Sequence, residues 1–157
     1  MGRGIDPRGE GALAMREARF RIRTVTWEQA ETDIRAVRET VFIQEQRVPE
    51  DLEWDGLDPE CEHVLAYDDR GNVIGTARLT EDGRIGRMAV LEPWRGRGVG
   101  DLLLQAVLDL ARRQGFPRVT LAAQTYAIGF YERHGFTAVG GVFPDAGIPH
   151  REMILEL

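Results

Sequence analysis

The sequence contains no lysine, and all of its 20 basic residues are arginine. A Walker-type nucleotide-binding loop needs a lysine directly before Ser or Thr to hold the terminal phosphates, so this class of protein is excluded. The formal net charge is −6. This charge gives no sign of a surface for nucleic acids or anionic membranes, and we expect neither partner.

Cysteine is nearly absent, because Cys61 stands alone in 157 residues. A single cysteine excludes an internal disulfide and a cysteine-based metal cluster, so we expect a packing role for Cys61, no metal, and a reducing compartment. The sequence also lacks a run of about 20 apolar residues, the length of a membrane-spanning helix, and its N-terminus lacks the apolar core of a signal peptide. These absences predict a cytoplasmic protein.

The length suits one domain, since 43% of the 157 residues are hydrophobic and two domains would each be small. Residues 1–18 are rich in glycine, arginine and small side chains and show no useful periodicity. We interpret them as a disordered N-terminal extension, with Met15 as an alternative start. A single domain is then expected over residues 19–157.

Hydrophobic periodicity predicts strands and helices throughout this domain. Strands are expected at 20–24, 63–67, 73–79, 85–90, 119–123, 136–139 and 151–155, and helices at 28–46, 99–113 and 126–135. The second, third and fourth strands form an antiparallel meander, whereas strand 119–123 should run parallel to strand 85–90 because a helix separates them. Where this parallel pair splays, its backbone groups could bond an amide-bearing ligand. Residues 144–149 are expected to form a loop that could reach over the site.

Acidic residues crowd the segment 45–62, which we expect to be a loop. Seven of them lie between Glu50 and Glu62. The favoured interpretation is a solvated loop that keeps the protein soluble, because charge runs usually have this role. The alternative is an acidic rim that attracts a cationic amine and raises its rate of association.

Three glycines, at positions 96, 98 and 100, stand between a predicted strand and the clearest predicted helix. Glycine lets the backbone turn sharply and bring its N–H groups close to a ligand, and the positive end of the helix dipole points at the same place. Arg95 and Arg97 flank the turn and could neutralise an anion. The spacing differs from the G-x-G-x-x-G turn of dinucleotide-binding proteins. The segment Arg95–Gly100 therefore predicts a site for a diphosphate or a phosphorylated cofactor.

Two motifs together resemble the GNAT superfamily of N-acyltransferases. They are Arg95-x-x-Gly98-x-Gly100 and, about 30 residues later, Ala127-Ile128-x-Phe130-Tyr131-Glu132-Arg133-x-Gly135-Phe136. The phrases at 41–46, 55–58, 85–87 and 147–153 are further similar to the ElaA-like (YjcF-like) branch. Many GNAT enzymes carry asparagine three residues before the alanine of the second motif, where this chain has Gln124. No asparagine role is therefore carried over.

The resemblance implies a mixed α/β fold of the GNAT type, with a central, mostly antiparallel sheet, one parallel splayed pair, and helices on both faces. It implies transfer of an acetyl group from acetyl-CoA, as cosubstrate, to a small-molecule or peptide amine, without a metal because the thioester is itself activated. The pyrophosphate would bind the N–H groups of Arg95, Gly96, Arg97, Gly98, Val99 and Gly100. The donor to the oxyanion would be the backbone of Met88, Ala89 and Val90.

Catalytic groups are expected for the departing thiolate and for the amine proton. By resemblance, Tyr131 is the general acid, and the alternative is an aromatic ring that packs beside Phe130. Candidate bases are Glu45, His63 and His150, each near the predicted open end of the sheet, or a chain of waters.

Each candidate base has a structural alternative that is more common. The two histidines could be hydrogen-bonded structural residues, and Glu45 could cap a helix or pair with Arg47 or Arg87. For Arg87 itself, an ion pair is favoured over a contact with an acidic group of the substrate.

Two other functions stay open at this point. One is a non-catalytic module that binds or senses acyl-CoA, against which Tyr131 argues. The other is an enzyme similar to acyl-homoserine-lactone synthases, which usually need a basic surface for an acyl carrier protein. Edge strands near the C-terminus could also pair two copies into a homodimer.

Overall fold

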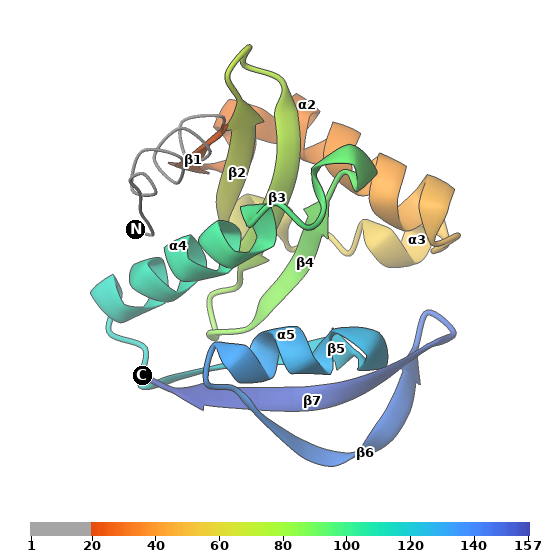
Figure 1. The fold of residues 1–157 in the computed structure, drawn as a ribbon, viewed down its shortest axis with the longest axis vertical. Coiled ribbons are helices and arrows are strands. Elements are labelled where there is room, and N and C mark those ends of the chain that lie inside the picture. The colour runs from red at the N-terminus through yellow and green to blue at the C-terminus, as the bar shows by residue number, and fades with distance from the viewer. Residues whose placement is uncertain (1–19) are drawn as a thin grey trace.

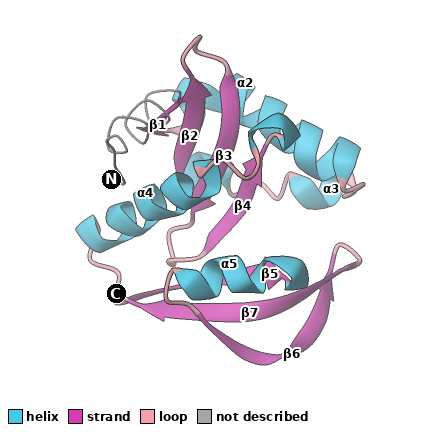
Figure 2. Ribbon diagram, in the orientation of Figure 1, coloured by secondary structure: helices cyan, strands magenta, loops and turns pink. Residues whose placement is uncertain are grey.

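The computed structural model describes residues 20–157, so the predicted extension at residues 1–18 lies outside the described residues. Within the described range, the strands form a four-stranded sheet in the order β1-β2-β3-β4 and a three-stranded sheet in the order β5-β7-β6 (Figures 1 and 2). The strands are β1 (Phe20–Val25), β2 (Glu62–Asp68), β3 (Val73–Leu79), β4 (Ile85–Val90), β5 (Arg118–Gln124), β6 (Thr137–Asp145) and β7 (Ile148–Glu156). The predicted strands are thus present, and most are a residue or more longer than expected.

The four-stranded sheet is antiparallel and carries a helix on each face. α2 (Trp27–Arg38) begins at Thr26, whose hydroxyl accepts a hydrogen bond from Gln29 N in a capping box, and it continues into a π-helical segment (Glu39–Glu45). Alternate residues of β2 point to opposite faces, so Leu65 packs with Ile34 of α2 while Val64 joins the core with Leu103 of α4 (Val99–Arg113). The predicted arrangement of helices on both faces is confirmed. Within residues 20–157, the helices are too short or too polar to cross a bilayer.

The two sheets meet where β4 and β5 begin. A parallel bridge joins Arg84 to Thr120, and Thr120 N donates to Gly83 O at 3.1 Å. Beyond this point the two strands belong to different sheets and diverge, as Figure 1 shows. The predicted splayed parallel pair is therefore present. Along the diverging part, the outer edge of β4 has no strand partner within the described residues.

The segment 144–149 is a hairpin end and not the predicted loop. Pro144 pairs with Pro149 and Asp145 with Ile148, so that only Ala146 and Gly147 form the turn. The prediction ended the preceding strand at Val139. The structure instead bulges there, since the register shifts between Val139 and Phe143, and pairing with β7 resumes afterwards.

The acidic segment is also more ordered than expected. It contains the short helix α3 (Glu50–Glu53), followed by a 3₁₀ turn (Asp58–Glu60). Glu53 and Asp58 are each only 3% exposed, and both accept hydrogen bonds at 2.7 Å from Arg38, which is fully buried. The two expectations, a solvated loop and an acidic rim, are therefore wrong for these two carboxylates. Their ion pairs with Arg38 hold the segment against α2.

Candidate functional site

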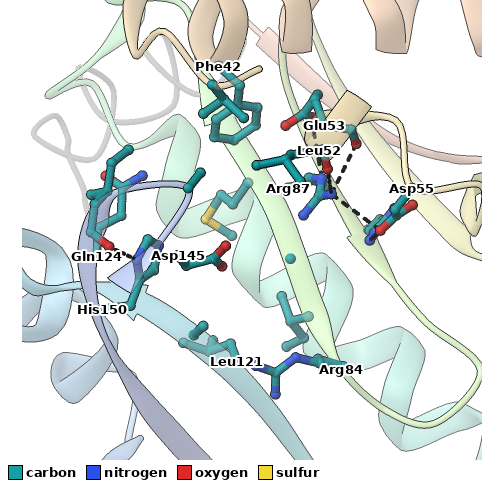
Figure 3. Close-up of a pocket in the computed structure, with 18 of the residues that line it drawn as sticks. Phe42, Leu52, Glu53, Asp55, Arg84, Arg87, Leu121, Gln124, Asp145 and His150 are labelled. Carbon is teal, nitrogen blue, oxygen red and sulfur yellow. Dashed lines mark hydrogen bonds and ion pairs between the residues drawn. The ribbon is translucent and has the colours of Figure 1, made fainter. Parts of the chain in front are cut away.

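A cavity of about 410 Å³ lies between the diverging strands β4 and β5 (Figure 3). The β6–β7 hairpin forms a further wall, and the segment from Phe42 to Leu57 closes another side. A volume of this size suits a small organic molecule. The lining residues discussed below are Phe42, Gln46, Leu52, Leu57, Arg87, Met88, Gln124, Tyr126, Tyr131, Asp145 and His150.

Tyr131 of α5 (Ile128–Arg133) lines the cavity. Its hydroxyl lies 3.8 Å from the sulfur of Met88, and edge-on contacts with Phe130 and Phe136 hold the ring in place. The packing role and the position at the site therefore coexist. Burial, with a smaller contribution from Tyr126, raises the pKa of Tyr131 to about 12. The phenol consequently keeps its proton throughout the neutral range.

His150 lines the same cavity from β7. Its Nδ1 lies 2.7 Å from the carbonyl oxygen of Ile148, and its ring stacks on Phe143. A carbonyl can only accept a hydrogen bond, so Nδ1 carries the proton and Nε2 of the neutral ring is left with its lone pair. This arrangement can accept a proton at Nε2.

The other two candidate bases lie outside the cavity lining. His63 is 1% exposed, its Nε2 lies 3.0 Å from the carbonyl oxygen of Asp58, and its ring lies against Trp27. Glu45 is bound through both carboxylate oxygens, and the hydrogen bond from Arg95 lowers the pKa of Glu45. Of the three histidine and glutamate candidates, His150 alone shares the cavity with Tyr131.

The glycine loop stands between the end of β4 and α4. Gly96 and Gly98 have φ values of +77° and +88°, and a Cβ added at either would meet no atom within 4 Å. Gly98 is the N-cap of α4 and, having no side chain, leaves the first N–H groups of the helix without a side-chain cap. An open cradle of backbone donors at a helix N-terminus fits a phosphate group. The residues present therefore suit the pyrophosphate of CoA.

The two arginines of this loop are held in different ways. Arg95 donates from Nε to the carbonyl oxygen of Val90 at 2.8 Å and from both terminal nitrogens to Glu45. Arg97 lies over the ring of Trp94, 4.8 Å from its centroid. Both guanidinium groups are thus anchored by the protein beside the cradle.

The strand β4 contains a bulge that changes the direction of its side chains. Thr76 pairs with Ala89 and Arg78 pairs with Gly86, so two residues, Arg87 and Met88, stand opposite one residue of β3. Arg87 has a φ of +52°, a left-handed conformation that costs a non-glycine residue on the order of 1–3 kcal/mol. Met88, Ala89 and Val90, the predicted oxyanion donors, follow directly along the diverging edge of β4.

Sequence reasoning missed two polar features of the cavity. Gln124 Nε2 donates to Gln46 Oε1 at 2.9 Å and so links the end of β5 to the residue after the π-helical segment. Asp145 enters the cavity from the segment that was expected to be a loop. Neither has a local signal in the sequence, because the first joins residues 78 positions apart and the second depends on the β6–β7 register.

The part of the chain that the structure describes holds no group of three or more His, Cys, Asp or Glu side chains placed to bind a metal ion.

Comparisons with known proteins agree on one family. A family model described as an acetyltransferase (GNAT) domain matches residues 25–157. The chain is similar to the uncharacterized N-acetyltransferase YjcF of Bacillus subtilis, with 40% identity over 121 residues that cover 75% of this chain and 86% of that protein. It is similar in structure to an acyl-CoA N-acyltransferase from Pseudomonas aeruginosa, with 30% sequence identity and a TM-score of 0.75. The match covers 86% of this chain and 98% of that one. The structure of Escherichia coli ElaA is also similar, with 27% sequence identity and a TM-score of 0.77. The match covers 87% of this chain and 99% of ElaA.

Proposed function

Because this chain belongs to the GNAT family of acetyltransferases, we propose that it transfers an acetyl group from acetyl-CoA to the amine of a small molecule or to an exposed amino group. The family uses an acyl-CoA as cosubstrate, and the open backbone of Gly96 and Gly98 offers a place for its pyrophosphate. The acetyl group and the identity of the amine are the parts of this proposal that go beyond family membership.

The reaction has a simple balance. The amine nitrogen attacks the thioester carbonyl carbon, a C–N bond forms, and the C–S bond breaks. The nitrogen loses one proton, and the departing sulfur gains one. The protein must therefore accept a proton on the side of the amine, donate one on the side of the sulfur, and stabilise the negative charge that develops on the carbonyl oxygen.

Tyr131 is proposed as the donor to the sulfur. A phenol with a pKa of about 12 is a weak acid, but it stays protonated and can direct its O–H at a developing thiolate. For the amine proton we propose His150, whose Nε2 carries the lone pair, in preference to Glu45 and His63. The backbone of Met88 to Val90, on the unpaired edge of β4, would serve the oxyanion.

One observation carries this assignment. Tyr131 and His150, which come from α5 and β7, both line a single cavity at the place where β4 and β5 separate. The proposed proton donor and proton acceptor therefore line the same cavity, which an acceptor amine would enter to reach the edge of β4.

The test is thiol release from acetyl-CoA across a panel of small amines and peptides, with the acetylated product identified by mass spectrometry. We expect one equivalent of free CoA for each equivalent of N-acetylated product. Binding of acetyl-CoA without product from any amine in the panel would contradict the proposed transfer. Thiol release without an acetylated amine would indicate hydrolysis instead.

A further inference from the structure

Arg87 occupies an unusual backbone position on the wall of the cavity. It is the first of the two bulged residues of β4 and has a left-handed φ of +52°. A strained non-glycine residue of this kind persists where its surroundings fix it, and a bulge can re-aim a side chain toward a site. The Arg87 side chain lines the cavity, as Figure 3 shows.

The guanidinium of Arg87 is held from one side only. Its Nη2 donates to the carbonyl oxygens of Leu52 and Glu53, at 3.2 and 3.0 Å, and to Asp55 Oδ2 at 3.2 Å. The buried Nε lies 3.3 Å from Glu53 Oε2 but without hydrogen-bond geometry. Within residues 20–157, Nη1 donates to no protein atom, and Figure 3 shows no dashed line from that side of the group. One arm of a rigid fork is therefore available to a ligand.

Arg87 belongs to a cluster whose charges balance within the protein. The guanidinium groups of Arg38, Arg78 and Arg87 share the carboxylates of Glu53, Asp55 and Asp58. Burial lowers the pKa of Arg87 and outweighs the opposing effect of the negative charges of Glu53 and Asp55. The guanidinium nevertheless stays charged at neutral pH. A carboxylate at Nη1 would give the unpartnered arm of this guanidinium a charge-assisted hydrogen bond.

The opposite wall carries the opposite sign. Asp145 points into the cavity from the β6–β7 hairpin and faces β4 (Figure 3). It has no cationic partner within 4.0 Å among the residues that the structure describes. Arg84, which also lines the cavity, is paired with Glu152 but is near enough for its charge to interact with that of Asp145. Apolar side chains of Phe42, Leu52 and Leu57 line the cavity as well. The cavity thus contains the free arm of Arg87, the carboxylate of Asp145 and apolar surface.

We propose that Arg87 is a specificity-determining residue and that the acceptor is an aliphatic amino acid, whose carboxylate binds Arg87 Nη1 while its ammonium group enters on the side of Asp145. This inference rests on the proposed acetyl transfer and names its substrate class. A simple diamine would bring a second positive charge toward the guanidinium, whereas a zwitterion matches both walls. The amine loses its proton before attack, and the remaining steps are those given above.

A matched set of acceptors tests the inference without changing the protein. The set is leucine, leucinamide and 3-methylbutylamine, which share the amine and the apolar body but differ in the carboxylate, with 1,5-diaminopentane as a dication. We expect kcat/KM for leucine to exceed that of each other compound by roughly 10- to 100-fold, the range for a lost charge-assisted hydrogen bond. Equal or better turnover of the amide, the monoamine or the diamine would overturn the proposal.

Variants at position 87 separate recognition from folding. In Arg87→Gln, the ratio of kcat/KM for leucine to that for leucinamide should fall to near 1, while KM for acetyl-CoA stays unchanged. Arg87→Lys keeps a cation beside Glu53 and Asp55 and should retain part of the preference. Arg118→Gln, which removes an exposed arginine paired with Glu156, is the matched control and should leave the ratio as in the wild type. A parallel fall for both acceptors with an unchanged ratio would mean that Arg87 is only structural.

Calorimetric titration of the CoA-saturated protein with leucine and leucinamide measures acceptor binding without requiring acetyl transfer. It therefore tests this inference separately from the proposed transfer. If no amine releases thiol, binding of leucine that is weakened at least 10-fold in Arg87→Gln, with leucinamide binding weakly to both proteins, would still support the role of Arg87. Equal binding of the two compounds, or binding of neither, would overturn it.

Discussion

The guanidinium of Arg95 binds both carboxylate oxygens of Glu45, each at 2.7 Å, and so ties the first residue of the glycine loop to the end of the π-helical segment. The same side chain donates from Nε to the carbonyl oxygen of Val90, the last residue of β4. Glu45 therefore orients a residue beside the proposed pyrophosphate cradle. A carboxylate in this bidentate pair is poorly placed to act as a base in the cavity.

The candidate bases should consequently differ in kinetic effect. We expect His150→Gln to lower kcat by roughly 100-fold, the usual contribution of a general base. Glu45→Gln should keep kcat within about threefold of the wild type. It should change the free energy of unfolding by less than about 1 kcal/mol, because the ion pair that it removes is exposed. Steady-state kinetics with saturating acetyl-CoA and chemical denaturation measure these effects. The reverse ranking would transfer the role of base to Glu45.

Tyr131→Phe should lower kcat by about 10- to 100-fold with little change in the affinity for CoA, because the ring packing remains and only the donor is lost. Tyr67→Phe is the control, since Tyr67 bonds Asp33 on another face of the sheet. The pKa of Tyr131, about 12, also predicts that any loss of activity between pH 8 and 10 arises from another group. Turnover of Tyr131→Phe equal to that of the control would remove its role as acid.

Gly98→Asp should weaken CoA binding by at least about 100-fold, because a carboxylate would fill the open cradle and repel the phosphates. Gly115→Asp provides a matched control at the other end of α4, where φ is +83° and a Cβ would also meet no atom within 4 Å. Calorimetry measures the affinity, and circular dichroism checks the fold. Equal affinities of the two variants would argue against the pyrophosphate assignment.

Asp58→Asn should destabilise the fold by about 3–5 kcal/mol, the usual cost of breaking a buried ion pair from one side. Asp58 accepts hydrogen bonds from Arg38 at 2.7 Å and from Arg78 at 3.0 Å. The exposed neighbour Glu60 is the control, and Glu60→Gln should stay within about 0.5 kcal/mol of the wild type. Urea unfolding at neutral pH measures both, and a similar small change for both variants would show that the buried pair contributes little.

Stability should depend on pH through His63. Burial lowers the pKa of His63, so the unfolded chain binds a proton at a higher pH than the folded protein does. The contribution of the neutral ring is therefore complete above about pH 6.5, the ordinary value, and is lost as the pH falls below it. Unfolding free energies measured from pH 8 to 5 should show this decline, and His63→Gln should flatten it. An equally steep decline in the variant would assign it to other groups.

Local sequence patterns predicted the framework well. Apolar residues at helical spacing defined α4, with Leu103 and Val107 in the core and Gly115 just beyond its end. Alternation defined the meander of β2 to β4, and the two motifs identified the family before any geometry was known. These features depend on residues within a few turns of one another, so a single stretch of sequence contains the necessary information.

Which side chains line the cavity was far less predictable from the sequence. Local reasoning treated Glu45, His63 and His150 as equivalent. In the structure, Glu45 pairs with Arg95, His63 is buried against Trp27, and His150 lines the same cavity as Tyr131. Local reasoning also ended a strand at Val139, whereas the structure continues this strand past a bulge to Asp145.

The sequence by itself determined the family, most of the helices and strands, and the glycine loop at 95–100, because backbone preferences and hydrophobic spacing act over short distances. Only the tertiary structure decided that Arg87 takes a left-handed conformation with one arm in the cavity, and that Asp145 faces it from the hairpin. Those outcomes depend on strand register and on ion pairs between residues more than 30 positions apart. Packing of the whole chain selects such partners, and no local pattern specifies them.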